Sequence, residues 1–127
     1  INYKAGTLVS DIQCYARILH LIAHFELGHF ALLEYLVKSV YRFLAKMEDL
    51  NVVQREILYF LRKELRTNPA HLQHAFIQLK NKLGKLKDHP SERRSFLYLD
   101  IISWLESKIQ NRPVQEVIRE KFEKRRR

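Results

Sequence analysis

The stretch from Ile12 to Met47 constrains the fold more than any other part of this chain. Its apolar residues are dense, it contains no proline, and its only glycine is Gly28. Glycine tolerates the left-handed backbone conformation in which many helices end. We therefore predict two apolar helices joined by a tight turn at Gly28, which together form a helical hairpin.

The rest of the chain also favours long helices with few turns. It has 127 residues, of which 46% are hydrophobic and 29% charged, and it contains only three glycines and three prolines. This composition is that of a globular protein and excludes a disordered one. A chain of this length can bury roughly two thirds of the surface that it exposes when unfolded. We expect one helical domain over residues 1–127.

Apolar residues recur at helical spacing in six segments, and no strand-like alternation occurs. The breaks between the later segments are Thr67-Asn68-Pro69, Asp88-His89-Pro90 and Asn111-Arg112-Pro113. The helices are predicted at about 8–27, 30–48, 52–65, 70–87, 91–110 and 114–123. Because the connections are short, neighbouring helices should run antiparallel. The predicted fold class is all-α, with about six antiparallel helices in three helical hairpins.

Polar residues near the predicted helix ends indicate how the helices begin. Thr7, Ser10 and Asp11 are candidate caps for the first helix, and Asp49 or Asn51 for the third. In the fifth helix, two apolar stripes predict packing on both sides, and Asp100, Ser103 and Ser107 should form its polar stripe.

The first helix carries one narrow polar stripe on an otherwise apolar surface. Its members, Gln13, Arg17, His20 and His24, lie at offsets 0, 4, 7 and 11. A helix this apolar has to be covered over most of its circumference. We interpret the stripe as a candidate recognition surface for a protein or peptide partner.

Two histidine pairs have the spacing of metal ligands. His20 and His24 are four residues apart, which can direct two imidazoles at one ion. However, no carboxylate joins them on the stripe, and the charge of Arg17 lies on the same stripe. His71 and His74 have no completing Cys, Asp or Glu nearby. The sequence therefore predicts no metal site.

No catalytic motif is present, so neither an enzyme nor a cofactor is predicted. Cys14 lies in the middle of an apolar helix, where a buried core residue is expected and not a nucleophile. Asp100 is the one acid within an apolar segment. The single cysteine rules out an internal disulfide, and no apolar run of about 18 residues occurs. These features favour a cytoplasmic protein that does not cross a membrane.

The net charge of +9 is unevenly placed. Residues 1–50 carry five basic and five acidic residues, whereas residues 51–127 carry eighteen basic and nine acidic ones. The candidate anion-binding residues are Lys80, Lys82, Lys85, Lys87, Arg93 and Arg94. A second basic group comprises Arg119, Lys121, Lys124, Arg125, Arg126 and Arg127. Basic clusters attract phosphate backbones, so the alternative function is nucleic-acid binding through the clusters at 80–94 and 119–127.

The turn Gly28-His29-Phe30 resembles the turn of a tetratricopeptide repeat, in which glycine, a polar residue and an aromatic join the two helices of a unit. Leu33 and Val40 stand at small-residue positions of the second helix. Glu48-Asp49-Leu50 replaces the proline that usually follows. The resemblance implies a stack of helical hairpins that binds proteins or acts as a scaffold.

Two longer segments, Leu19–Leu44 and Phe96–Ile109, resemble the C-terminal helical region of large bacterial proteins built from such repeats. This resemblance implies that the chain is a C-terminal fragment of a longer protein. The preceding repeats of that protein would then be a further candidate partner. No ligand site comes with the resemblance.

Overall fold

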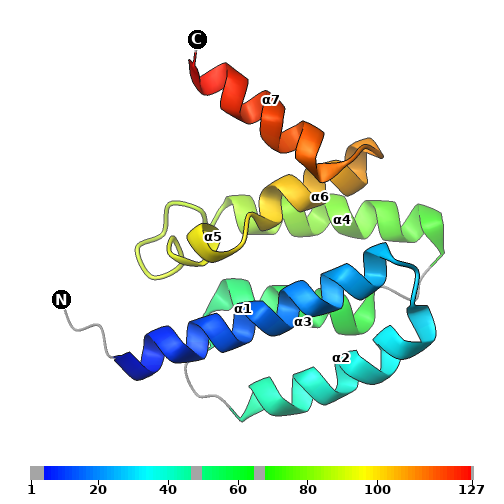
Figure 1. Cartoon of the computed structure of the whole chain (residues 1–127), viewed down its shortest axis with the longest axis vertical. Coiled ribbons are helices and arrows are strands. Elements are labelled where there is room, and N and C mark those ends of the chain that lie inside the picture. Colours follow the sequence, from blue (N-terminus) through cyan, green and yellow to red (C-terminus); the bar gives the residue numbers. More distant parts are fainter. Residues whose placement is uncertain (1–4, 47–49, 65–67, 127) are drawn as a thin grey trace. The chain divides into compact units, whose positions relative to one another are not determined.

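The computed structural model describes residues 5–46, 50–64 and 68–126, and most of these are helical (Figure 1). The helices are α1 (Ala5–Glu26), α2 (Phe30–Ala45), α3 (Val52–Lys63), α4 (Pro69–Gly84), α5 (Ser95–Tyr98), α6 (Ile101–Gln110) and α7 (Val114–Arg126). No strand occurs within the described ranges, which confirms the all-α class. The three-hairpin arrangement and its likeness to tetratricopeptide repeats stay predictions.

The helices form two compact units, Ile1–Leu65 and Arg66–Arg127. In the first unit, α1 packs against α2, and α3 packs against both of them. In the second unit, α6 packs against α4 and against α7. Each unit therefore has one helix pair at its centre and a third long helix added to it.

The core of the first unit comes from the apolar faces that the sequence predicts. On α2, Leu33, Val37 and Leu44 are buried, and Leu36 and Val40 are partly buried. Met47, which continues this apolar spacing in the sequence, lies outside the described residues. Ile18 and Leu21 of α1 are fully buried. Burial of side chains of this size supplies most of the free energy that holds such helices together.

The first turn, at Gly28, has the predicted left-handed geometry, with a φ of 75°. The backbone N–H of His29 donates to the carbonyl of His24 over 3.0 Å, and that of Gly28 donates to Phe25 over 3.1 Å. This pair of hydrogen bonds is the Schellman motif, which satisfies two carbonyls at the end of a helix. The turn reverses the chain, so α2 returns along α1 (Figure 1).

Asn51 is the cap of α3. Asp49, the other predicted candidate, lies outside the described residues. The Asn51 side chain accepts a hydrogen bond from the N–H of Gln54 at 2.8 Å, and the Gln54 side chain accepts one from the N–H of Asn51 at 2.9 Å. This reciprocal pair is a capping box. The Nε2 of Gln54 also donates to Oδ1 of Asp11 on α1, at 3.2 Å.

The predicted start of the first helix is wrong by about three residues, because α1 begins at Ala5. Asp11 is therefore an internal residue of α1 and not its cap. Its side chain is buried and accepts the hydrogen bond from Gln54. The sequence alone gives no sign of this internal role, because the partner of Asp11 lies 43 residues away in the chain.

The predicted helix over 91–110 is wrong in its first half. Residues 85–94 form turns, α5 covers only Ser95–Tyr98, and Leu99 is extended, with φ −147° and ψ 120°. Asp100 then caps α6, since its Oδ1 accepts from the N–H of Ser103 at 3.1 Å. This break explains why the described residues contain seven helices where about six were predicted.

The polar stripe assigned to the fifth helix is also wrong for its two serines. Ser103 and Ser107 are buried. Ser103 Oγ donates to Oδ2 of Asp100 at 2.7 Å, and Ser107 Oγ donates to the carbonyl of Trp104 at 2.6 Å. Because their hydroxyls are satisfied locally, these serines can face the packed side of α6.

Candidate functional site

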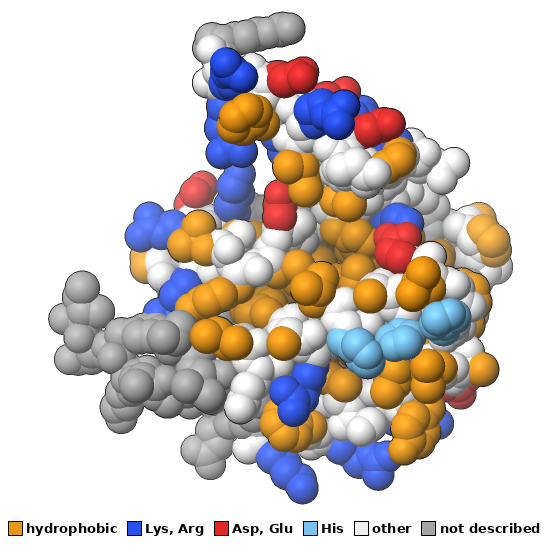
Figure 2. Space-filling model, in the orientation of Figure 1, with side chains coloured by type: hydrophobic (Ala, Val, Ile, Leu, Met, Phe, Trp, Pro, Cys, Tyr) orange, Lys and Arg blue, Asp and Glu red, His pale blue; other side chains and the backbone are white. Residues whose placement is uncertain are grey.

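Three histidines form a continuous row on the first unit, which we call the histidine row. His24 Nε2 lies 3.1 Å from His20 Nε2, and His24 Nδ1 lies 3.1 Å from His29 Nδ1. His20 and His29 are exposed, and His24 is partly exposed. Figure 2 shows the row in pale blue, bordered by hydrophobic side chains. Both ring nitrogens of the central imidazole are therefore engaged.

The turn geometry explains why His29 joins the row. In a Schellman motif, the third residue before the end of the helix and the second residue after its end come into contact. Here these positions hold His24 and His29. The same turn brings the rings of Phe25 and Phe30 to 6.0 Å. The sequence prediction placed only His20 and His24 on the stripe, although the motif at Gly28 contained the signal for His29.

The row affects the protonation of its central member. Desolvation lowers the pKa of His24 below its ordinary value of 6.5, and repulsion from His20 and His29 lowers it further. The neutral form is therefore favoured, and neutral imidazole can donate from one nitrogen while accepting at the other. This agrees with the two contacts that His24 makes.

The remaining two residues of the predicted polar stripe lie one and two turns earlier on α1. The guanidinium of Arg17 lies over the Phe43 ring of α2, 3.9 Å from its centroid, and its NH1 donates to the Gln13 carbonyl at 3.2 Å. Gln13 is exposed. The stripe is therefore continuous along α1, and Arg17 connects it to an aromatic side chain of α2.

Large apolar side chains are exposed on the same hairpin. Leu19 of α1 is 54% exposed, and Tyr35 of α2 is 67% exposed. Further exposed members are Ile12, Leu27, Phe30, Leu32 and Phe43. On α1 the exposed Ile12, Ala16, Leu19 and Ala23 recur at helical spacing. Helix α1 thus has an exposed apolar stripe besides its polar one. We call these two stripes, together with the exposed Phe30, Leu32, Tyr35 and Phe43 of α2, the hairpin surface.

The basic candidates lie on the second unit and differ in their surroundings. Lys80 is partly buried, whereas the other residues of the first cluster are exposed. Its Nζ lies 3.2 Å from Glu106 Oε2. The other members are on the last turn of α4 and the following turns: Lys82, Lys85, Lys87, Arg93 and Arg94. The structure therefore brings most of the cluster into one exposed stretch of chain.

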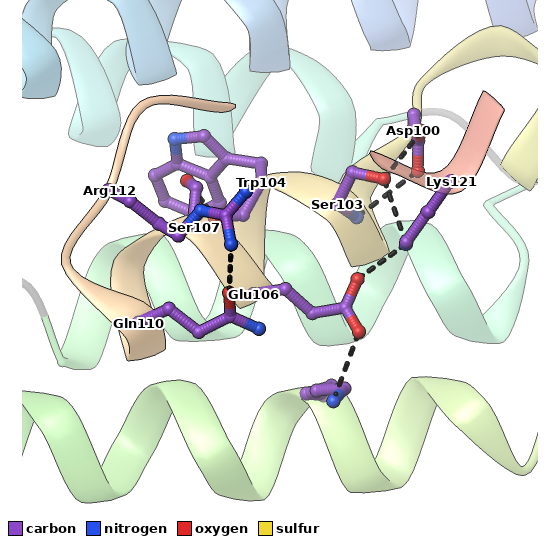
Figure 3. Close-up of polar contacts among 9 residues, drawn as sticks. Asp100, Ser103, Trp104, Glu106, Ser107, Gln110, Arg112 and Lys121 are labelled. Carbon is purple, nitrogen blue, oxygen red and sulfur yellow. Dashed lines mark hydrogen bonds and ion pairs between the residues drawn. The ribbon is translucent and has the colours of Figure 1, made fainter. Parts of the chain in front are cut away.

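Glu106 joins the two basic groups that the sequence treats as separate. Besides Lys80, it pairs with Lys121 of α7, whose Nζ also donates to Ser103 Oγ at 2.9 Å. Ser103 in turn donates to Asp100, so that polar contacts connect α4, α6 and α7 (Figure 3). We call these residues the Glu106 network. Its lysines are engaged by carboxylate and hydroxyl groups of the protein.

The lysines set the protonation of Glu106. Partial desolvation acts to raise its pKa, but hydrogen bonds from Lys121 and Lys80 and their charges outweigh that effect, so the net pKa is lowered. The carboxylate is therefore ionised at neutral pH. It serves here as the shared counter-charge of one lysine from each of the two helices that pack against α6.

The remaining residues that the sequence singled out for chemistry are buried in the core, cap a helix or lie exposed on α4. Cys14 is fully buried, and burial together with the nearby Asp11 charge raises the pKa of its thiol to about 12, against a smaller opposing effect of Arg17. A thiol with this pKa is protonated at neutral pH and is a poor nucleophile. Asp100 serves as the cap of α6. His71 and His74 are exposed on α4, where the N–H of His71 donates to the cap residue Asn68 at 2.9 Å.

Two further features of the described residues bear on the candidate sites. Within residues 5–46, 50–64 and 68–126, no group of three or more His, Cys, Asp or Glu side chains is arranged to hold one metal ion. None of the described helices is both long and apolar enough to cross a membrane.

Comparison of the chain with models of protein families, with curated proteins and with solved structures found no match. The functional interpretation therefore rests on the residues of this chain.

Proposed function

We propose that this chain is a non-catalytic helical module of the tetratricopeptide-repeat type, which binds a protein partner through the hairpin surface of α1 and α2. The observation that carries the proposal is an arginine held over an exposed aromatic ring, on a hairpin that also exposes large apolar side chains. Arg17 is held over Phe43, while Leu19 and Tyr35 are more than half exposed. Arginine and aromatic residues dominate the energetics of protein interfaces.

The packing of the first unit supports the repeat interpretation. In a hairpin array, each hairpin buries its outer face against the next. Helix α3 packs against both α1 and α2, as the first helix of a following hairpin would. In a longer protein, preceding repeats would compete with a separate partner for the stripe of Ile12, Ala16, Leu19 and Ala23 on α1.

The chemistry of the surface indicates which peptide it would take. Apolar side chains on α1 and α2 suit an amphipathic helix that inserts its own apolar residues at helical spacing. The guanidinium of Arg17 suits a carboxylate on that helix, because charge-assisted hydrogen bonds to arginine are stronger than neutral ones. The expected partner is therefore an amphipathic helix with an acidic residue beside its apolar face.

Selection from a displayed library of random helical peptides tests this function on the whole chain. We expect enriched peptides to combine apolar residues at i and i+3 or i+4 with Asp or Glu. Binding should weaken at least tenfold in Phe43→Ala and in Arg17→Ala. The matched control is Leu97→Ala, which removes an apolar side chain that is 84% exposed on the second unit. Peptides that bind all three variants equally, or a failure to enrich any peptide, would refute the proposal.

Nucleic-acid binding is a second candidate because nearly all of the excess positive charge belongs to the second unit. Residues 66–127 contain fifteen Lys and Arg against seven Asp and Glu, whereas residues 1–65 contain eight against seven. An excess of this kind attracts a phosphate backbone and makes binding strongly salt-dependent. The Glu106 network reduces this excess locally, since it engages Lys80 and Lys121.

The second candidate is tested by titrating a single-stranded oligonucleotide into the chain at several salt concentrations. The double variant Lys82→Glu, Lys85→Glu should lose affinity and lower the salt slope by about 1 to 1.5, because each lost phosphate contact removes about 0.7. The double variant Lys38→Glu, Arg42→Glu on α2 makes the same charge change on the first unit. Equal losses in both variants would show that binding follows net charge alone.

A further inference from the structure

Two imidazole nitrogens of the histidine row are already placed as a pair of metal ligands. His20 Nε2 and His24 Nε2 lie 3.1 Å apart on successive turns of α1. Nitrogens bound to zinc lie about 2.0–2.1 Å from the ion, so two of them at a right or tetrahedral angle are about 2.9–3.4 Å apart. We propose that His20 and His24 bind one divalent transition-metal ion through these nitrogens, with His29 as the outer partner of His24.

His29 provides what a metal-binding histidine usually requires from its surroundings. A ligating imidazole commonly donates its other ring N–H to a nearby acceptor, which fixes its tautomer and its orientation. His24 Nδ1 lies 3.1 Å from His29 Nδ1. When His24 Nε2 is bound to the ion, His24 carries its proton on Nδ1 and donates it to His29. The same tautomer on His20 frees its Nε2, so each neutral imidazole keeps one proton.

Arg17 does not oppose the ion as the sequence suggested. Its guanidinium lies over the Phe43 ring, and its NH1 donates to the carbonyl of Gln13, one turn further from the histidines. The cation is thus directed along α1 away from His20 and towards α2. The charge argument against a metal at this stripe is therefore weaker than the sequence alone suggests.

The ligand set selects the class of ion. Imidazole nitrogens suit Zn²⁺, Cu²⁺ and Ni²⁺, while Ca²⁺ and Mg²⁺ require oxygen ligands. Because no third protein ligand converges with His20 and His24 among the described residues, water completes the coordination. For a given nitrogen site the affinity rises from Ni²⁺ to Cu²⁺ and falls again at Zn²⁺. Cu²⁺ should therefore bind most tightly.

Titration calorimetry of the whole chain with Zn²⁺ and with Cu²⁺ tests the site. We expect one ion per chain, and a loss of affinity of at least tenfold in both His20→Ala and His24→Ala. His29→Ala should weaken binding by about 10- to 100-fold if it acts as an outer partner. The matched control is His71→Ala, His74→Ala, which removes two histidines three residues apart on α4 and should leave the affinity unchanged.

The electron paramagnetic resonance spectrum of the Cu²⁺ complex provides a second readout that does not depend on affinity. It should show hyperfine coupling to two imidazole nitrogens in the unaltered chain and to one in His24→Ala. The proposal would be overturned if neither His20→Ala nor His24→Ala weakened ion binding, or if binding were lost only when His71 and His74 are removed. The absence of any ion binding would overturn it as well.

The metal site and the proposed partner binding can fail separately. Metal binding is measured on the chain alone, whereas the peptide test depends on Phe43 and Arg17, which do not ligate the ion. A chain that binds peptides but no metal retains the proposed function and loses only this inference.

Discussion

Gly28 and Gly84 occupy opposite kinds of backbone position, which makes them a matched pair at the scale of single residues. Gly28 has a φ of 75°, while Gly84 is the last residue of helix α4. A Cβ at Gly28 would have no neighbour closer than 3.9 Å, and a Cβ at Gly84 would have none within 4 Å. Space is therefore available at both, and the backbone alone decides the effect of a side chain.

We expect Gly28→Ala to lower the free energy of unfolding by about 1 kcal/mol, because an L-residue is strained in the left-handed region. Gly84→Ala should raise it by about 0.5–1 kcal/mol, since alanine restricts the unfolded chain and suits a helix. Urea denaturation followed by circular dichroism measures both. Effects of the same sign in the two variants would contradict the backbone explanation.

Glu106 is a residue whose contribution should depend on pH. Its pKa is lowered in the folded chain by Lys121 and Lys80. Its ion pairs therefore stabilise the fold above the ordinary carboxyl pKa of 4.5, and this stabilisation is lost as the pH falls through the lower folded value.

We expect Glu106→Gln to destabilise the chain at pH 7 by about 1 kcal/mol or less, because the pairs are partly exposed. The difference from the unaltered chain should vanish in acid, below the folded pKa of Glu106. Denaturation curves at several pH values measure it. Glu116→Gln, which removes a carboxylate 54% exposed beside Arg112, is the control and should have a smaller effect. A difference that is independent of pH would show that the charge is not responsible.

At the scale of elements, sequence pattern predicted which segments are helical better than where helices begin. The apolar spacing of α2 needed only neighbouring residues and was found as predicted for the described residues. The break at Asn68-Pro69 is likewise a local signal, and α4 begins there, one residue before the predicted start at about Ala70. The break before α6 was missed, because Leu99 and Asp100 lie within a regular apolar pattern. The competing interaction there is the cap formed by the side chain of Asp100.

In the candidate site, too, contacts between residues close in the chain were easier to predict than contacts between helices. The alignment of His20 with His24 followed from helical spacing. His29 was not predicted to join them, although the turn motif at Gly28 contained the signal for it. The position of Arg17 had no such local signal, since it depends on Phe43, which is 26 residues away in the chain and on another helix. Contacts of this kind are set by packing between helices, for which the sequence contains no local signal.

The cap at Asp100 provides the prediction at this scale. Asp100→Ala should lower the free energy of unfolding by about 1 kcal/mol, because the first turn of α6 loses its acceptor. Asp100→Asn retains a side-chain oxygen and should recover most of that loss. Thermal or urea unfolding measures the two variants. Equal stability of Asp100→Ala and Asp100→Asn would indicate that the cap does not determine the start of α6.

For the whole molecule, the division into two compact units suggests two separate unfolding transitions. The chain contains a single tryptophan, Trp104, which lies in the second unit and packs edge-on against Phe76 at 5.7 Å. Its fluorescence should therefore report the second unit, whereas circular dichroism reports both. Each unit also contains fully buried leucines, among them Leu21 in α1 and Leu105 in α6.

We expect Leu105→Ala to destabilise the unit that Trp104 reports by about 2–5 kcal/mol, the usual cost of such a cavity. Leu21→Ala should shift part of the circular dichroism transition and leave the fluorescence midpoint unchanged. Urea unfolding recorded with both probes makes the comparison. Coincident transitions that move together in both variants would show that the two units unfold as one cooperative body.

The hydrogen bonds of Gln54 have a consequence for the geometry of the first unit. One amide closes the capping box of α3 with its oxygen and reaches Asp11 of α1 with its nitrogen. If α3 slid along α1 by one residue, both Asp11 and the Gln54 amide would be left buried with a broken hydrogen bond, at a cost of about 1–3 kcal/mol. Apolar side chains alone tolerate such sliding more readily. The axial position of α3 on α1 is therefore restricted to a single discrete register.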